Sequence, residues 1–245
     1  MTLSRSYARA PADIRPVTID PGFVESADGS CLISVGKTRV ICTASVSDQV
    51  PRWMMGKGRG WVTAEYGMLP ASTGDRKQRD VSKGRPDGRT VEIQRLIGRS
   101  LRAVAGIDAF GPRSVYVDCD VLQADGGTRC AAITGAWTAL ALAVGRLRRR
   151  GALERDPLRD SVAAVSTGIV GGATLLDLAY VEDARAEVDM NVVATGRGRF
   201  VEVQGTAEGG TFAPDDLGAL TALALRGIAE LTRLQAAAVA AGEAR

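Results

Sequence analysis

A glycine pair between a strand pattern and a helix pattern is the part of the sequence best suited to bind an anion. The segment runs Asp125-Gly126-Gly127-Thr128-Arg129. Glycines at such a junction let backbone N–H groups face one point, and the N-terminus of the following helix adds positive potential. Thr128 would supply a hydroxyl and Arg129 a planar guanidinium that can hold two phosphate oxygens. The alternative is an ordinary turn with Thr128 as the helix N-cap and Arg129 solvated, and this segment alone leaves both open.

A second arginine lies at a similar junction. Arg89 closes a polar, basic loop and precedes a helix pattern in which Thr90 is the expected N-cap. A single exposed arginine is usually only solvated. Two arginines, each at the N-terminus of a predicted helix, favour a site for phosphate.

Two aspartates flank a predicted hairpin turn of sequence Asp183-Ala184-Arg185-Ala186. The turn would bring Asp183 near Asp189 on the polar face of the returning strand. Two carboxylates so placed could bind Mg²⁺. Turns and exposed strand faces also favour acidic residues for structural reasons, so the spacing alone does not decide between the two interpretations.

Two glycine-containing segments fail the tests for nucleotide-binding loops. Gly36-Lys37-Thr38 has Cys31 where a Walker A loop requires glycine, and a strand pattern follows it instead of a helix. We interpret it as a hairpin turn. The run Gly56-Lys57-Gly58-Arg59-Gly60 lacks the strand–turn–helix frame of a dinucleotide site.

The composition excludes several kinds of chemistry. The 245 residues include no histidine, which removes Ser-His-Asp, Cys-His and His-ligated metal schemes. A metal would need oxygen ligands, which favours Mg²⁺, with Mn²⁺ as an alternative. The four cysteines form no CxxC pair, which fits a reduced, intracellular setting. Residues 1–11 contain no apolar run typical of a signal peptide, and the longest apolar run, Ala136–Val144, is too short to span a membrane. We therefore expect a cytoplasmic protein without membrane contact.

Basic residues are concentrated in one part of the chain. Between Arg52 and Arg102 there are 12 Lys or Arg against 5 Asp or Glu, whereas the whole chain is only +3. This distribution indicates an anionic partner such as nucleic acid. A solvated basic loop would give the same count.

The periodicity predicts an α+β fold of two similar strand-then-helix halves packed together, residues 1–150 and 151–245. In the first half we expect a β-meander over Arg15–Val46 and then a strand at 61–66. A long polar loop over 67–89 leads to a helix at 90–106, which is followed by a strand at 114–122 and a helix at 128–150. A polar linker at 152–160 leads to strands at 162–170, 173–181, 187–194 and 200–204 and a helix from Pro214 to about 240.

Six segments, in order along almost the whole chain, resemble the ribonuclease PH family. They are Arg15–Val17, Gly60–Tyr66, Gly88–Arg99, Asp118–Arg129, Ala186–Val192 and Phe200–Thr206. The two longest are far more specific than a short motif. The resemblance implies the ribonuclease PH fold and a phosphorolytic 3′→5′ exoribonuclease. Such an enzyme trims tRNA precursors with inorganic phosphate as co-substrate, releases nucleoside diphosphates, and in reverse adds nucleotides to RNA 3′ ends.

The resemblance also implies roles for individual residues. The family's phosphate-binding positions match Arg89, Gly127, Thr128 and Arg129. Its catalytic acidic pair, which holds Mg²⁺, matches Asp183 and Asp189. Two tRNA contacts in the basic loop match Arg76 and Arg79. The family further implies a homohexamer built as a trimer of dimers.

The chain departs from the family pattern in two regions. Ser6–Arg9 stands where an Asp-Gly-Arg run is usual, with Asp13 in place of Glu, which weakens any role assigned to the N-terminus. Ala71 follows Leu69-Pro70 where many members have arginine, so one tRNA contact would be lost or supplied elsewhere.

Two rival functions remain open at this point. A hydrolytic Mg²⁺ nuclease would release monophosphates without needing phosphate. A non-catalytic RNA-binding ring subunit would be expected to lack the acidic pair or the phosphate arginines, which this chain retains. Phosphorolysis suits a chain without histidine, because inorganic phosphate is already an anion near neutral pH and needs positioning more than deprotonation.

Overall fold

The N-terminal part of the chain forms a five-stranded sheet. The computed structural model describes residues 5–79, 82, 84–85 and 87–244. The strands are β1 (Val17–Pro21), β2 (Gly29–Val35), β3 (Thr38–Ser47), β4 (Trp61–Met68) and β5 (Ser114–Gln123), in the spatial order β1-β2-β3-β5-β4. The first three form the predicted meander and β5 is antiparallel to β3, whereas β4 is parallel to β5. The crossover that a parallel pair requires contains α1 (Gly88–Val104).

The C-terminal part forms a second, fully antiparallel sheet. Its strands are β6 (Val162–Val170), β7 (Ala173–Leu176), β8 (Val188–Thr195) and β9 (Phe200–Ala207), in the order β7-β6-β8-β9. A short helix, α3 (Tyr180–Asp183), lies between β7 and β8. Short 3₁₀ turns also occur among the described residues, at η1 (Ser6–Ala8), η2 (Arg52–Met54) and η4 (Ile107–Phe110).

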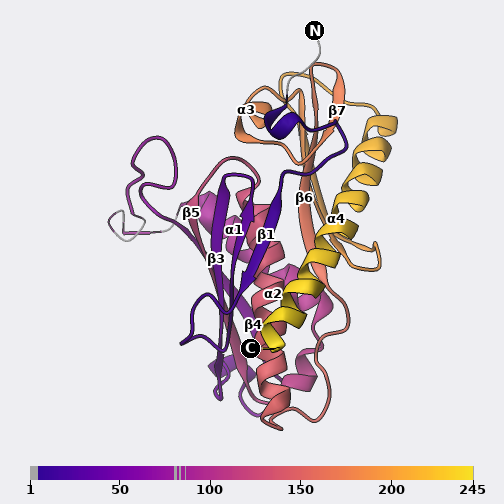
Figure 1. Ribbon diagram of the computed structural model, residues 1–245. Helices are drawn as coiled ribbons and strands as arrows, with labels where there is room; N and C mark the ends of the chain where they lie inside the picture. Colours follow the sequence, from indigo (N-terminus) through magenta and orange to yellow (C-terminus); the bar gives the residue numbers. More distant parts are fainter. Residues whose placement is uncertain (1–4, 80–81, 83, 86, 245) are drawn as a thin grey trace.

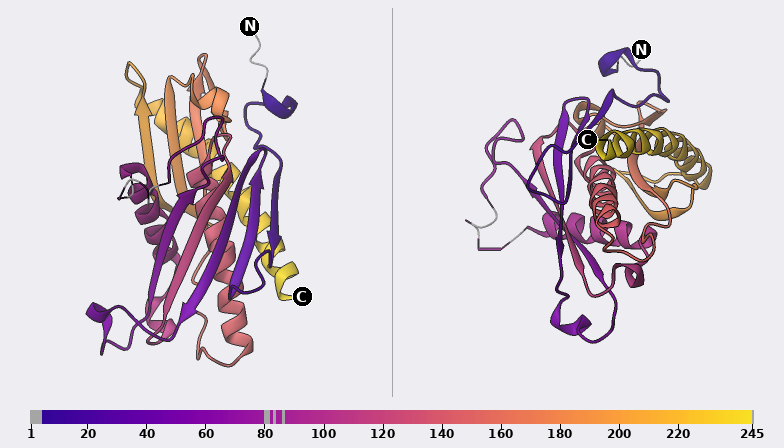
Figure 2. Two further views of the ribbon diagram at one scale, coloured as in Figure 1. Left: turned by 90° about the vertical axis from the view of Figure 1, so that its left-hand side faces the viewer. Right: turned by 60° about the horizontal axis from the view of Figure 1, so that its bottom comes forward.

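One helix joins the two sheets. α2 (Thr128–Arg149) packs against β2, β3 and β5 on one side and against β6 and α4 (Pro214–Glu243) on the other; Figures 1 and 2 show it between the two sheets. It is long and apolar enough to cross a membrane, but 89% of its apolar window is buried inside the protein, so it is the core helix of this fold. Cys31, Cys42 and Cys119 lie next to one another on the adjacent strands β2, β3 and β5, and all four cysteines are buried with free thiols.

The strands and helices confirm the predicted α+β class, and the observed helix starts correct two details. Asp87, not Thr90, is the N-cap of α1, because its carboxylate accepts a hydrogen bond from the Thr90 N–H at 2.6 Å. Arg89 therefore lies inside the first turn of α1. Gly127 is the N-cap of α2, and Thr128 is the first helical residue.

The predicted strand at 173–181 and the hairpin turn after it are wrong. β7 ends at Leu176, and Asp177 has a φ of +55°, which takes the chain out of the strand. The chain then forms α3, with Asp183 as its last residue. Because β7 and β8 lie on opposite sides of β6, residues 177–187 cross over that strand instead of forming a tight turn.

Candidate active site

The turn at residues 125–129, called the phosphate turn below, joins β5 to α2 and has a backbone conformation that favours glycine at two positions. Gly126 and Gly127 have φ angles of +79° and +67°. A Cβ on Gly126 would lie 2.7 Å from the carbonyl oxygen of Leu178. The N–H groups of Gly126, Gly127 and Thr128 have no hydrogen-bond acceptor among the residues that the structure describes. They are free donors at the N-terminus of a 22-residue helix, the arrangement that binds anions.

Thr128 is held by a tyrosine that the sequence did not single out. Tyr66 is buried at the end of β4, and its hydroxyl donates to Thr128 Oγ1 at 3.0 Å. Burial raises the pKa of Tyr66, against the opposing effects of this hydrogen bond and of Arg89 and Arg129. The Thr128 hydroxyl hydrogen remains available to a ligand.

The two arginines differ in how they are held. Arg129 Nη1 donates to Gln204 Oε1 at 2.9 Å and to Glu92 Oε1 at 3.2 Å, and its side chain is 16% exposed. This contact joins α2 to α1 and to β9 of the second sheet. Arg89 is exposed, and its side chain has no hydrogen bond or ion pair with the described residues. Glu92 and Gln204 lie in segments far apart in sequence, and no spacing rule connects them.

Asp183 lies near enough to Asp189 to raise its pKa, although no hairpin joins them. Burial raises the pKa of Asp183, while the charges of Arg89 and Arg129 lower it. Burial and the charge of Asp183 raise the pKa of Asp189 to about 6, against the same two arginines and a hydrogen bond from Asn191. The structure therefore brings the predicted acidic pair and both predicted phosphate arginines into one electrostatic cluster.

The acidic pair fits a divalent cation. Asp189 Oδ1 is buried and has no hydrogen-bond partner in the described structure, while Oδ2 accepts only a long 3.5 Å contact from Asn191 Nδ2. A buried carboxylate oxygen without a partner is costly. Oxygen donors are also what Mg²⁺ and Mn²⁺ prefer, so Asp183 and Asp189 are suitable ligands.

The two arginines predicted to contact tRNA lie apart from this cluster. Arg76 and Arg79 are exposed on the loop between β4 and α1, which projects from the body of the molecule (Figure 1). Ala71, the departure noted above, lies exposed on the same loop. Residues 80, 81, 83 and 86 of the predicted basic loop lie outside the described residues.

Two family models match the chain and together cover most of it. The model described as "3' exoribonuclease family, domain 1" matches residues 13–144. The model described as "3' exoribonuclease family, domain 2" matches residues 160–227. The first contains the phosphate turn and Arg89, and the second contains Asp183 and Asp189.

Curated relatives and solved structures agree with these matches. Proteins named ribonuclease PH from serogroup C and serogroup A strains of Neisseria meningitidis are each 54% identical to this chain over 234 residues, which is 96% of this chain and 97% of each relative. The crystal structure of rice Rrp46 matches with a TM-score of 0.77 at 16% identity, over 96% of this chain and 100% of that one. A subunit of the Archaeoglobus fulgidus exosome, solved with RNA in its active site, matches with a TM-score of 0.76 at 20% identity, over 94% and 92% of the two chains. These structural likenesses concern the fold.

Proposed function

The chain belongs to the ribonuclease PH family of phosphate-dependent 3′→5′ exoribonucleases, and we propose that it trims the 3′ ends of tRNA precursors at the cluster formed by the starts of α1 and α2 and by the α3–β8 segment. In the forward direction, an oxygen of inorganic phosphate attacks the phosphorus of the last phosphodiester, and the bond from that phosphorus to the 3′ oxygen of the preceding nucleotide breaks. The products are a nucleoside diphosphate and an RNA one nucleotide shorter with a free 3′ hydroxyl. Since the bond formed resembles the bond broken, excess diphosphate drives nucleotide addition to RNA 3′ ends.

The observation that carries the site assignment is the meeting of cations, free amides and raised-pKa carboxylates in one place. Arg89, Arg129 and the N–H groups of the phosphate turn offer positive charge and donors to inorganic phosphate. The hydroxyl of Thr128, fixed by Tyr66, adds a further donor. Arg129 would exchange its contacts with Glu92 and Gln204 for phosphate oxygens. Positioning of this kind supplies most of the catalysis in phosphoryl transfer.

Asp183 and Asp189 would hold Mg²⁺, with Mn²⁺ as an alternative. When bound, the cation supplies compensation for negative charge that develops in the transition state. By fixing the position of the cation, the two carboxylates would orient the RNA 3′ end toward the bound phosphate. The partnerless Oδ1 of Asp189 supports this assignment.

The remaining parts of the proposal concern organisation and partners. Residues 1–150 would provide the phosphate-binding segments and the basic loop, and residues 151–245 the acidic pair. We infer a cytoplasmic homohexamer, a trimer of dimers, in which Arg76 and Arg79 contact the body of the tRNA. Their exposure on a projecting loop supports that contact.

The deciding experiment uses a short tRNA precursor with a labelled 3′ extension, Mg²⁺ and the purified protein, with and without inorganic phosphate. Nucleoside diphosphates released only in the presence of phosphate are the expected result. Monophosphates released without phosphate would mean a hydrolytic nuclease. Bound but intact RNA in both reactions would mean a non-catalytic subunit.

The role of the basic loop has its own test. Replacing both Arg76 and Arg79 with Ala is expected to raise the KM for a tRNA precursor and to weaken its dependence on salt. The KM for phosphate and the rate on a short single-stranded RNA should stay the same. An unchanged KM for the precursor would remove the two arginines from the tRNA interface.

A further inference from the structure

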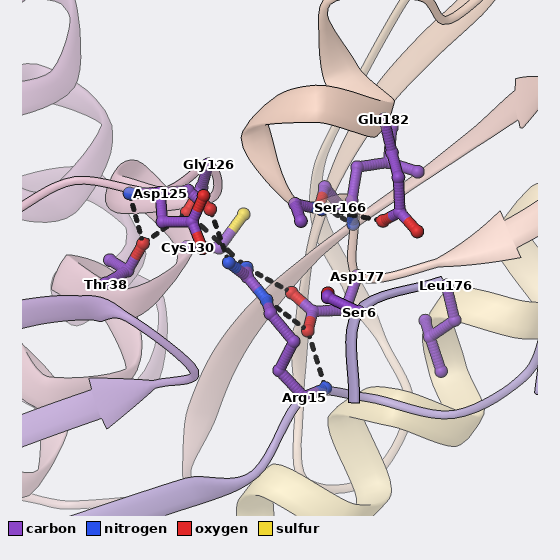
Figure 3. A network of polar contacts seen from close by, with 12 residues as sticks. Ser6, Arg15, Thr38, Asp125, Gly126, Cys130, Ser166, Leu176, Asp177 and Glu182 are labelled. Carbon is purple, nitrogen blue, oxygen red and sulfur yellow. Dashed lines mark hydrogen bonds and ion pairs between the residues drawn. The ribbon is translucent and has the colours of Figure 1, made fainter. Parts of the chain in front are cut away.

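We propose that Arg15 is a positioning residue that ties the phosphate turn to the segment carrying Asp183, so that phosphate and metal are bound by one rigid unit. This inference rests on the proposed function and adds a residue to it. Arg15 is not one of the residues assigned above to bind phosphate or the cation. It lies in the N-terminal segment just before β1 and is 1% exposed, and its guanidinium lies between Asp125 and Asp177 (Figure 3).

Arg15 holds the phosphate turn by its carbonyl groups. Its Nη1 donates to the carbonyl oxygen of Asp125 at 2.5 Å, and its Nη2 donates to that of Gly126 at 3.4 Å. Thr38 supports the same turn from β3. Its hydroxyl donates to the Gly126 carbonyl oxygen at 2.7 Å and accepts from the Asp125 N–H at 2.8 Å.

These contacts fix where the free amides point. All the described peptide bonds are trans, and in a trans peptide the C=O of one residue and the N–H of the next point in opposite directions. With the carbonyls of Asp125 and Gly126 turned toward Arg15 and Thr38, the N–H groups of Gly126 and Gly127 point away from them. Those are donors without an acceptor in the described structure. Arg15 therefore orients the groups that receive the anion.

The other edge of the same guanidinium holds the segment that leads to Asp183. Arg15 Nε and Nη2 donate to the two carboxylate oxygens of Asp177 at 2.8 and 2.6 Å, and the Arg15 N–H donates to Oδ2 at 2.7 Å. Asp177 has a φ of +55°, a conformation that non-glycine residues adopt only when their surroundings impose it. The Tyr180 N–H at the start of α3 donates to the Asp125 carbonyl at 3.2 Å, so the two segments are also in direct backbone contact.

Two further arginines secure α3 from the N-terminal side. Arg5 Nε and Arg9 Nη2 donate to the two carboxylate oxygens of Glu182 at 2.8 and 3.2 Å. Glu182 is the residue before Asp183. The side chains of all three arginines and of both acids are at most 6% exposed. The N-terminal segment, for which the family comparison gave no role, is thus part of the framework that places Asp183.

The test compares Arg15→Lys with Thr38→Val. Lysine keeps the charge but cannot reach both segments with a planar fork, whereas valine removes only the support of the phosphate turn. Calorimetric titration with inorganic phosphate, without RNA, is expected to show affinity about tenfold lower or more in both variants, the order expected for losing charge-assisted or buried hydrogen bonds. Titration with Mn²⁺, followed by electron paramagnetic resonance, is expected to show weaker binding in Arg15→Lys alone.

Controls separate this effect from unfolding. Arg102→Lys is the matched variant, because Arg102 also donates to a buried-strand carbonyl, that of Val62 at 2.8 Å, but touches neither segment; it should bind both ions like the wild type. Circular dichroism confirms the fold of each variant. A folded Arg15→Lys with unchanged phosphate and Mn²⁺ affinities would overturn the inference while leaving the proposed function intact. Should Arg15→Lys not fold, Asp177→Asn is the second variant, because it weakens the contact of Arg15 with the segment that leads to Asp183; unchanged Mn²⁺ affinity in a folded Asp177→Asn would overturn the inference. Failure of the wild type to bind phosphate would instead remove the proposed function.

Discussion

Two adjacent residues of α3 belong to charge clusters with opposite properties. Glu182 faces the N-terminal segment, where Arg5 and Arg9 pair with it. Asp183 faces the site, where Arg89 and Arg129 lie near enough to affect its ionisation but form no ion pair with it in the described structure. We call the first the closed cluster, because ion pairs join its members Arg5, Arg9, Arg15, Asp177 and Glu182. We call the second the open cluster, because Arg89, Arg129, Asp183 and Asp189 have donors and acceptors without partners in the described structure.

The ionisation of the two residues shows the difference. Burial acts to raise the pKa of Glu182, but the hydrogen bonds from Arg5 and the Ala179 N–H and the charges of both arginines lower it overall. Desolvation raises the pKa of Asp183, and desolvation together with the charge of Asp183 raises that of Asp189 to about 6, because the charges of Arg89 and Arg129 lower these two pKa values by less. Carboxylates paired with cations contribute to the stability of the fold, whereas carboxylates whose burial is not offset by a partner, and whose pKa is therefore raised, are characteristic of functional sites.

The sharpest way to break this comparison is to neutralise one carboxylate of the open cluster. Asp189→Asn is expected to lower kcat for phosphorolysis by roughly 10³-fold, since charge compensation by a metal contributes several kcal/mol to the transition state. Single-turnover assays with the labelled tRNA precursor over a range of Mg²⁺ concentrations measure this. Wild-type rates in Asp189→Asn would exclude Asp189 as a ligand.

A substitution in the closed cluster should lower the free energy of unfolding. Glu182→Gln leaves Arg5 and Arg9 buried beside a neutral partner, and loss of one member of a buried ion pair costs about 3 kcal/mol. The folded-state pKa of Glu182 is depressed, so its stabilising contribution is present above its unfolded pKa and is lost as pH falls through the folded value. Urea unfolding should therefore show a large difference between Glu182→Gln and wild type at neutral pH that shrinks in acid. A difference independent of pH would mean that packing, not charge, is what the substitution removes.

Removing a cation from the open cluster should affect one substrate selectively. Arg129→Ala deletes a charge-assisted phosphate contact, worth about 2–3 kcal/mol, or about 30- to 150-fold in apparent phosphate affinity. The KM for RNA should change much less. Glu92→Gln, which weakens the contact that holds Arg129 in the ligand-free protein, provides a matched comparison. Unchanged phosphate affinity in Arg129→Ala would disprove the assignment of that arginine.

The sequence indicated the residues of the open cluster but not those of the closed one. Local patterns made the glycine pair before a helix, the arginines near two helix starts and the two aspartates candidates, and the resemblance to the ribonuclease PH family then implied their roles. Arg15 and Asp177 meet across 162 positions of sequence. Such a contact depends on how the sheets pack around α2, and no spacing rule encodes it. The same limit explains the missed crossover after β7, which depends on the strand order of the second sheet.

The smallest expected effect concerns the stability of the open cluster itself. The folded-state pKa of Asp189, about 6, lies above its ordinary value of 3.8, so the metal-free fold loses stability as pH rises from the ordinary pKa to the folded one, and the full loss is present above the folded pKa. In EDTA at about pH 8, Asp189→Asn should therefore be more stable than wild type by about 1–2 kcal/mol, since one pKa unit corresponds to about 1.4 kcal/mol and partial exposure reduces the effect. At about pH 4 the gain should vanish, and Mg²⁺ should reverse its sign by stabilising only the wild type. Thermal unfolding under these three conditions measures the difference. If Asp189→Asn were instead less stable than wild type at about pH 8 without metal, Asp189 would belong with Glu182 among the carboxylates that hold the fold together.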